Sequence, residues 1–107
     1  MIVHVEQGTF QREIEQYPGI ALVEFWAPWY KTSRALAPII ESIAQKYEGK
    51  IKVTKFNLDE NNNLALRFSV KLLPTLLFFS AGHKVAEHSG AFTEPLIEEM
   101  LQKLQKQ

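Results

Sequence analysis

The segment from Tyr30 to Arg34 is the part of this sequence whose residue types could carry chemistry. Tyr30 and Ser33 each carry a hydroxyl group, and Lys31 and Arg34 place positive charge beside them. A hydroxyl becomes a strong nucleophile only when a nearby base takes its proton, and the motif contains neither a histidine nor another base. Nucleophilic catalysis by Ser33 is therefore a weak hypothesis, although a base could fold in from elsewhere in the chain.

The same segment precedes a pattern of apolar residues at helical spacing, which gives it a simpler interpretation. Thr32 or Ser33 can serve as the N-cap of that helix, and we favour this interpretation. The alternative is an anion site, in which the unpaired N–H groups of the first helical turn act together with Lys31 and Arg34.

A carboxylate interrupts the apolar run Ile20–Trp26, which is otherwise typical of a strand buried on both faces. This residue is Glu24. In the later strand pattern Ile51–Leu58, Lys55 shares one face with Val53, so its stem is expected to be at least partly buried. Because an unpaired buried charge is costly, we predict a buried Glu24–Lys55 pair whose role is structural rather than catalytic.

Composition excludes several classes of function. The chain has no cysteine, which rules out disulfides, thiolate nucleophiles and thiolate metal sites. Twelve basic and twelve acidic residues give a formal net charge of zero, so the overall charge provides no electrostatic attraction to nucleic acid or an anionic membrane. A local basic patch stays possible, although no run of like charges indicates one. His4, His83 and His88 show no metal-binding spacing and are expected at the surface. We therefore expect no metal, no cofactor, no nucleic acid and no membrane partner.

Apolar runs fall short of the roughly 20 residues that span a bilayer. The first residues, Met1 to Glu6, lack the basic and apolar regions of a signal peptide. The expected location is the cytoplasm, and the expected oligomeric state is a monomer.

The elements that must position these residues alternate along the chain. Strands are expected at Ile2–Val5, Ile20–Trp26, Ile51–Leu58, Thr75–Ser80 and Lys84–Ser89, and helices at Phe10–Gln16, from Thr32 or Ser33 to about Tyr47, at Leu64–Phe68 and after Thr93. Thr9 is expected to cap the first helix, Pro38 to kink the second, and Asp59–Asn63 to form a polar break. This order predicts an α/β fold in a single domain spanning residues 1–107, with a central mixed β-sheet flanked by helices on both faces.

Several motifs, in order and at matching spacing, resemble the thioredoxin family. Residues Val23–Trp29 read Val-Glu-Phe-Trp-Ala-Pro-Trp, which is similar to the family segment that leads into its active site. Leu73-Pro74-Thr75 is similar to the family's Ile-Pro-Thr, whose proline is cis. Pro38, Gly82 and Gly90 also fall where the family keeps a proline or glycine. The resemblance runs from about Phe10 to Leu104 and implies the thioredoxin fold.

The departure from that family lies at its reactive motif. Tyr30, Lys31, Thr32 and Ser33 stand where the family has Cys-Gly-Pro-Cys. A phenol with a pKa near ~10 and an alcohol can neither form nor exchange a disulfide. The resemblance thus implies a redox-inactive member in which no catalytic residue is expected. In the family, an acidic residue at the position of Glu24 moves protons beside the cysteines, with a lysine nearby that matches Lys55.

The surface that the family uses to dock partner chains maps onto Trp29, Tyr30, Leu73, Pro74 and Gly90. Our leading hypothesis is non-covalent binding of a protein or peptide partner in this groove, with backbone hydrogen bonds along the cis-proline edge. The competing interpretation is that these residues remain only for stability. Two further alternatives are a glutathione-binding or transferase-like activity that uses the Tyr30 or Ser33 hydroxyl, and a structural, self-associating subunit.

Overall fold

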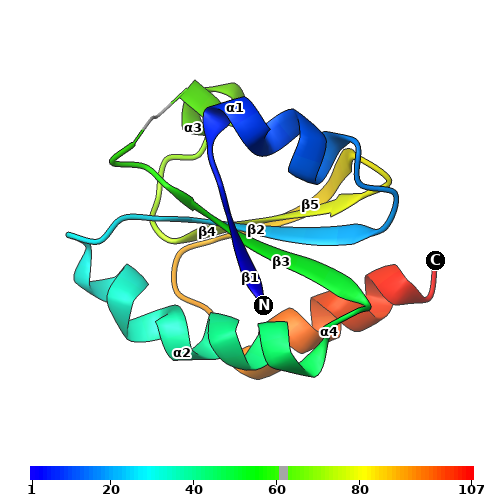
Figure 1. The fold of residues 1–107 in the computed structure, drawn as a ribbon. Coiled ribbons are helices and arrows are strands. Elements are labelled where there is room, and N and C mark those ends of the chain that lie inside the picture. The colour runs from blue at the N-terminus through cyan, green and yellow to red at the C-terminus, as the bar shows by residue number, and fades with distance from the viewer. Residues whose placement is uncertain (61–62) are drawn as a thin grey trace.

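The computed structural model describes residues 1–60 and 63–107 (Figure 1). The elements, in chain order, are β1 (Ile2–Val5), α1 (Gln7–Phe10), the π-helical segment η1 (Gln11–Glu15), β2 (Ile20–Trp26), α2 (Lys31–Lys46), β3 (Ile51–Asn57), α3 (Asn63–Arg67), β4 (Thr75–Ser80), β5 (His83–Ser89) and α4 (Glu94–Gln105). Within these two ranges, none of the helices has the length and apolarity that crossing a bilayer requires.

The strands form one mixed sheet in the order β1-β3-β2-β4-β5. The strands β1, β3 and β2 run parallel, and β4 and β5 are antiparallel to their neighbours. In Figure 1, α1 and α3 cover one face of this sheet, and α2 and α4 cover the other. The predicted α/β fold with a central mixed sheet between helical layers is confirmed.

Two separate cores fill the spaces between the sheet and its helices. Leu22 and Phe78 belong to the core that contacts α2 and α4. Val23 and Phe25 belong to the core beneath α1 and α3. Because successive side chains of a strand point to opposite faces, a nearly continuous apolar run such as β2 supplies both cores at once.

Two of the three predicted helix caps are wrong. The first helix begins earlier than expected, so Thr9 lies in its first turn, where its Oγ1 accepts a hydrogen bond from the Glu6 N–H at 2.9 Å. The second helix begins directly after Tyr30, whose N–H donates to Ala27 O at 3.1 Å, and this tight turn leaves Thr32 and Ser33 inside the helix. Thr93 does cap α4, and its Oγ1 accepts from the Leu96 N–H.

Other boundaries differ from the predictions by a residue or two. The helix α2 continues through Pro38, because most of its length packs an apolar face on the core. His83 belongs to β5 rather than to the preceding turn. The predicted polar break Asp59–Asn63 falls partly on residues 61–62, which lie outside the described residues.

The turn between β4 and β5 packs closely against the end of η1 at Gly82. This glycine has a φ of +84°, and a Cβ added to it would lie 2.1 Å from the backbone oxygen of Glu15. We expect Gly82→Ala to lower the free energy of unfolding by about 3 kcal/mol or more, because strain and a backbone clash add together. Urea denaturation followed by circular dichroism measures this change.

Gly8→Ala is the matched control, because a Cβ at Gly8 in α1 meets nothing within 4 Å. An alanine there is expected to be neutral or to stabilise the helix by up to about 1 kcal/mol. Equal stability of the two variants would contradict the close packing of Gly82.

Candidate functional site

The loop after β2 brings two aromatic side chains to the surface. Trp29 is 62% exposed and Tyr30 is 39% exposed, and their rings meet edge to face with centroids 6.0 Å apart. Trp29 Nε1 donates a hydrogen bond of 2.5 Å to Oδ1 of Asp59, which follows β3. An indole that is held by its polar atom while its ring faces solvent is suited to contacting another molecule.

These aromatic residues border a groove of about 320 Å³. It is lined by Trp29, Tyr30, Leu58, Val70, Lys71, Leu72 and Leu73. The structure thus brings together Trp29, Tyr30 and Leu73, which the sequence analysis assigned to one binding surface. Sequence reasoning missed the other four residues, of which Leu72 is the most informative, because 58% of it is exposed.

Pro74 and Gly90 lie beside this groove but do not line it. The Leu73–Pro74 peptide bond is cis, and Pro74 is buried. The Gly90 N–H donates to Pro74 O at 2.8 Å, which joins the segment after β5 to the start of β4. The backbone N–H and C=O of Leu73 make no hydrogen bond to another backbone group of the described residues. Leu73 therefore retains backbone groups that an extended segment could use.

The four residues at the position of the family's reactive motif divide between surface and interior. Tyr30 and Lys31 are exposed, Thr32 is half-buried, and Ser33 is 1% exposed. The Oγ of Ser33 has no hydrogen-bond partner within the described residues. This burial removes Ser33 from contact with a dissolved substrate, which counts against its predicted alternative role as an activating hydroxyl.

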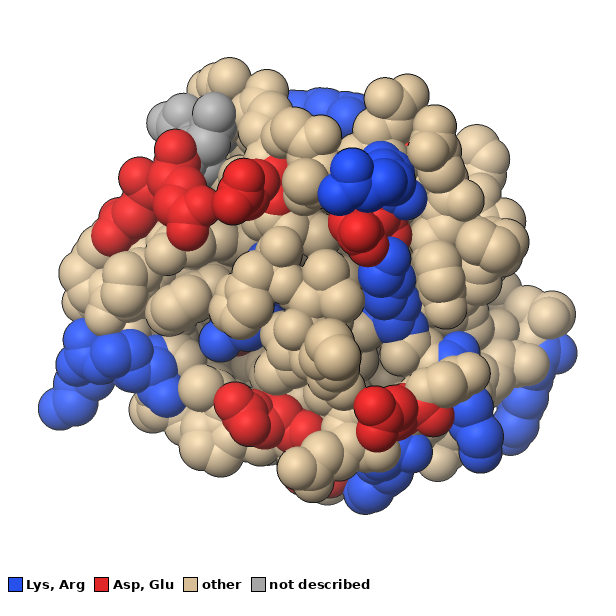
Figure 2. All heavy atoms as spheres, in the orientation of Figure 1, with Lys and Arg blue, Asp and Glu red and all other residues tan. Residues whose placement is uncertain are grey.

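Positive charge gathers where α2 begins, as Figure 2 shows. Lys31 and Arg34 are both exposed there, and Arg34 Nη1 donates to Pro28 O at 2.9 Å. The first turn of α2 contains no acidic residue, and Tyr30 supplies no side-chain cap to it in the described structure. The unpaired N–H groups of this turn add partial positive charge to that of the two side chains.

The buried charges lie on neighbouring strands. Glu24 of β2 and Lys55 of β3 are register partners, and Lys55 Nζ lies 3.7 Å from Glu24 Oε1. Glu24 is fully buried, and neither of its oxygens accepts a hydrogen bond from the described residues. Burial raises the pKa of Glu24 to about 7, against the opposing effect of the Lys55 charge. Lys55 Nζ also lies 4.1 Å from the centre of the Trp26 ring.

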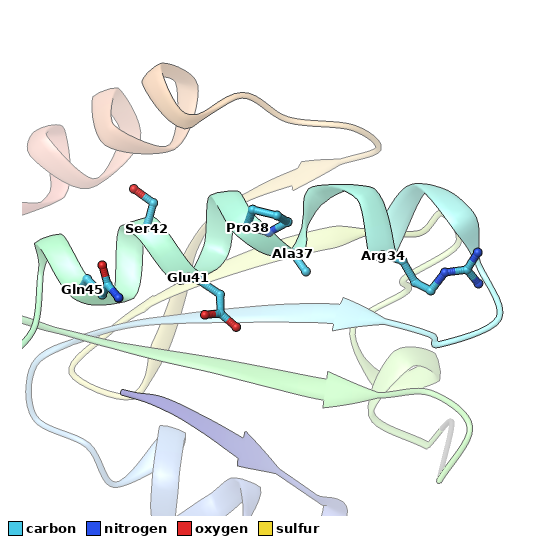
Figure 3. Close-up of a pocket in the computed structure, with 6 residues that line it drawn as sticks. All are labelled: Arg34, Ala37, Pro38, Glu41, Ser42 and Gln45. Carbon is cyan, nitrogen blue, oxygen red and sulfur yellow. The ribbon is translucent and has the colours of Figure 1, made fainter.

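Neither the hollow on α2 nor the three histidines form a second candidate site in the described part of the chain. Figure 3 shows a hollow of about 470 Å³, whose six lining residues all come from α2. Its Ser42 turns toward α4, where its Oγ donates to Glu94 Oε2 at 2.9 Å. His4 lies on β1, at the opposite sheet edge from His83 and His88 on β5. The described residues contain no cluster of His, Asp or Glu that could hold a metal ion.

Comparison with known proteins decides the family. The thioredoxin family model matches residues 1–103. The chain is 41% identical to thioredoxin 1 of Nostoc sp. over 99 residues, which are 92% of each chain. It is 37% identical to a thioredoxin of Synechocystis sp., again over 92% of each chain, and 34% identical to one of Porphyra purpurea over 95% of each chain. This chain belongs to the thioredoxin family.

Because it has no cysteine, this thioredoxin-family chain cannot carry out dithiol–disulfide exchange. Dithiol–disulfide exchange needs one thiolate to attack and a second thiol to resolve the mixed disulfide, and the sequence supplies neither. The fold is therefore retained without the reaction that such a pair of thiols performs.

The buried Glu24 predicts an unusual dependence of stability on pH. Its pKa of about 7 in the folded chain lies above its ordinary value of 4.5, so the folded chain binds more protons between these two values. The contribution of Glu24 to the free energy of unfolding is therefore highest below about pH 4.5, where Glu24 is protonated in the folded and the unfolded chain. It falls by about 3 kcal/mol as the pH rises through 7. Urea denaturation at a series of pH values measures it.

Glu24→Gln should remove this part of the pH dependence, because an amide does not titrate. The matched control is Glu99→Gln, which changes an exposed carboxylate on α4 and should leave the pH dependence unchanged. A Glu24→Gln protein with the pH dependence of the unsubstituted chain would show that Glu24 does not titrate in this range.

The arrangement of Tyr30 and Ser33 also predicts that part of the lost reaction can be restored. Tyr30→Cys combined with Ser33→Cys places one thiol at an exposed position and one at a buried position of the same helix start. We expect this variant to catalyse reduction of insulin by dithiothreitol, at a lower rate than a cyanobacterial thioredoxin. Lys31 and Thr32 lie between the two thiols and keep the recovery partial, since the intervening pair tunes thiolate stability.

The two single variants are the controls, and each should be inactive because it lacks the second thiol. A folded double variant without any activity would mean that the loop does not bring the two positions into the required geometry.

Proposed function

We propose that this chain binds a protein or peptide partner non-covalently through the groove between Trp29 and Leu73. The observation that carries the proposal is Trp29 itself, a mostly exposed indole that is fixed by Asp59 beside an apolar groove. Because the chain has no thiols, this surface cannot take part in disulfide chemistry. Contact with a partner accounts for its exposure.

The groove has the physical properties of a small binding surface. Trp29, Tyr30 and Leu72 expose large apolar groups that a partner would remove from water. Tryptophan and tyrosine are enriched among the residues that dominate interface energies, where truncation costs about 2 kcal/mol or more. The free backbone groups of Leu73 support the addition of an extended segment along this edge.

The alternatives receive less support from the geometry. Transferase-like chemistry would depend on Tyr30 alone, because Ser33 is buried. A titration with glutathione tests this alternative, and the absence of binding at millimolar concentration would remove it. A structural, self-associating subunit remains the other alternative, which size-exclusion chromatography tests.

We expect the substitutions Trp29→Ala and Leu72→Asp, made together, to abolish capture of specific partners from a native lysate. Both side chains are exposed, so the fold should tolerate the changes, whereas Leu73 also packs against the core and is less suited to the test. Mass spectrometry of the captured proteins is the measurement.

Leu66→Asp with Val85→Asp is the matched control, because these side chains are 71% and 46% exposed on α3 and β5, outside the groove. This control should capture the same partners as the unsubstituted chain. Identical capture by all three proteins would refute binding at the groove.

A further inference from the structure

Most of the positive charge in this chain is already paired. Seven of the twelve lysine and arginine side chains form ion pairs with carboxylates. The five that form none with the described residues are Lys31, Arg34, Lys50, Lys71 and Lys106. These five side chains are therefore the ones that are available to pair with acidic groups of another molecule.

One of the five, Lys71, lines the groove, and two others, Lys31 and Arg34, lie at the start of α2, directly after the groove residue Tyr30. Lys71 is exposed and lines the groove between Val70 and Leu72. Lys31 directly follows Tyr30, and Arg34 is held one helical turn later by Pro28 O. The uncapped start of α2 reinforces the same positive potential, because its N–H groups carry the positive end of the helix dipole.

The acidic residues near the groove lie on the side away from the start of α2, and one of them is already hydrogen-bonded. Asp59 accepts the hydrogen bond from Trp29 Nε1, and Glu60 follows it at the surface. Figure 2 shows acidic atoms on one side of an uncharged stretch of surface and basic atoms on the other side, at the start of α2. A bound segment thus meets positive charge on the α2 side and along Lys71.

We infer that the partner segment is an extended stretch of protein in which apolar side chains are flanked by aspartate or glutamate. This inference rests on the proposed function and adds the chemistry of the partner. The apolar side chains lie against Trp29 and Leu72, and the carboxylates face Lys31 and Lys71. Since the net charge of the chain is zero, the attraction is local and is weakened by salt.

Three synthetic peptides with one shared apolar centre, flanked by glutamate, glutamine or lysine, test the inference. Each carries a fluorescent label, and its affinity for the purified chain is measured by anisotropy. We expect the glutamate peptide to bind roughly tenfold more tightly than the lysine peptide at low salt, and this ratio to shrink at high salt. Equal affinities, a preference for the lysine peptide, or no binding by any peptide would overturn the inference.

The variants assign the preference to particular cations. Lys31→Gln with Lys71→Gln should remove the preference for the glutamate peptide. Lys50→Gln with Lys106→Gln removes two unpaired exposed cations outside the groove and should leave the preference intact. Persistence of the preference in the first variant, or its loss in the second, would also overturn the inference.

The outcomes separate this inference from the proposed function. Where the Trp29→Ala/Leu72→Asp protein loses its captured partners but the three peptides bind equally, the groove binds partners and the acidic chemistry is wrong. Where capture does not depend on the groove, the proposed function itself fails. A dimer in analytical ultracentrifugation that Trp29→Ala/Leu72→Asp dissociates would make a second copy of this chain the occupant and overturn the acidic segment.

Discussion

The structure depends on the burial of β2 on both of its faces. This strand lies at the centre of the sheet between β3 and β4, and Ala21 to Phe25 are all fully buried. Each of its side chains must fit one of two cores, so a shift of one residue in register would send every side chain to the wrong face. The register of β2 thereby fixes where the strand ends and where the site begins.

That constraint explains the position of the groove. β2 ends at Trp26, but Ala27 is still fully buried, so the chain reaches the surface only after Ala27, where the turn brings out Trp29 and Tyr30. On the neighbouring strand, β3 ends at Asn57, which places Asp59 within reach of the Trp29 indole. The site is thus assembled at adjacent ends of two parallel strands, where α/β folds commonly place their ligands.

Sequence periodicity predicted the sheet and its helical layers because the burial of one or both faces of an element determines the order of apolar and polar residues along it. It failed at the starts of α1 and α2; the backbone turn before Lys31, rather than the hydroxyls of Thr32 and Ser33, decides where α2 begins. Three of the seven residues that line the groove were predicted. The lining by Leu58 and Leu72 depends on segments that meet in space, and no local pattern distinguishes their exposed faces from core residues.

The Glu24–Lys55 pair is a consequence of the same central strand. A carboxylate at this position cannot reach water, and its raised pKa shows that the charge of Lys55 offsets only part of the cost of burial. Removing one partner of a buried pair leaves the other charge uncompensated, whereas replacing both by apolar groups is often tolerated. The pair is therefore difficult to lose by single substitutions, even in a chain without thiols to which Glu24 could transfer a proton. This coupling supports the prediction that the role of the pair is structural rather than catalytic.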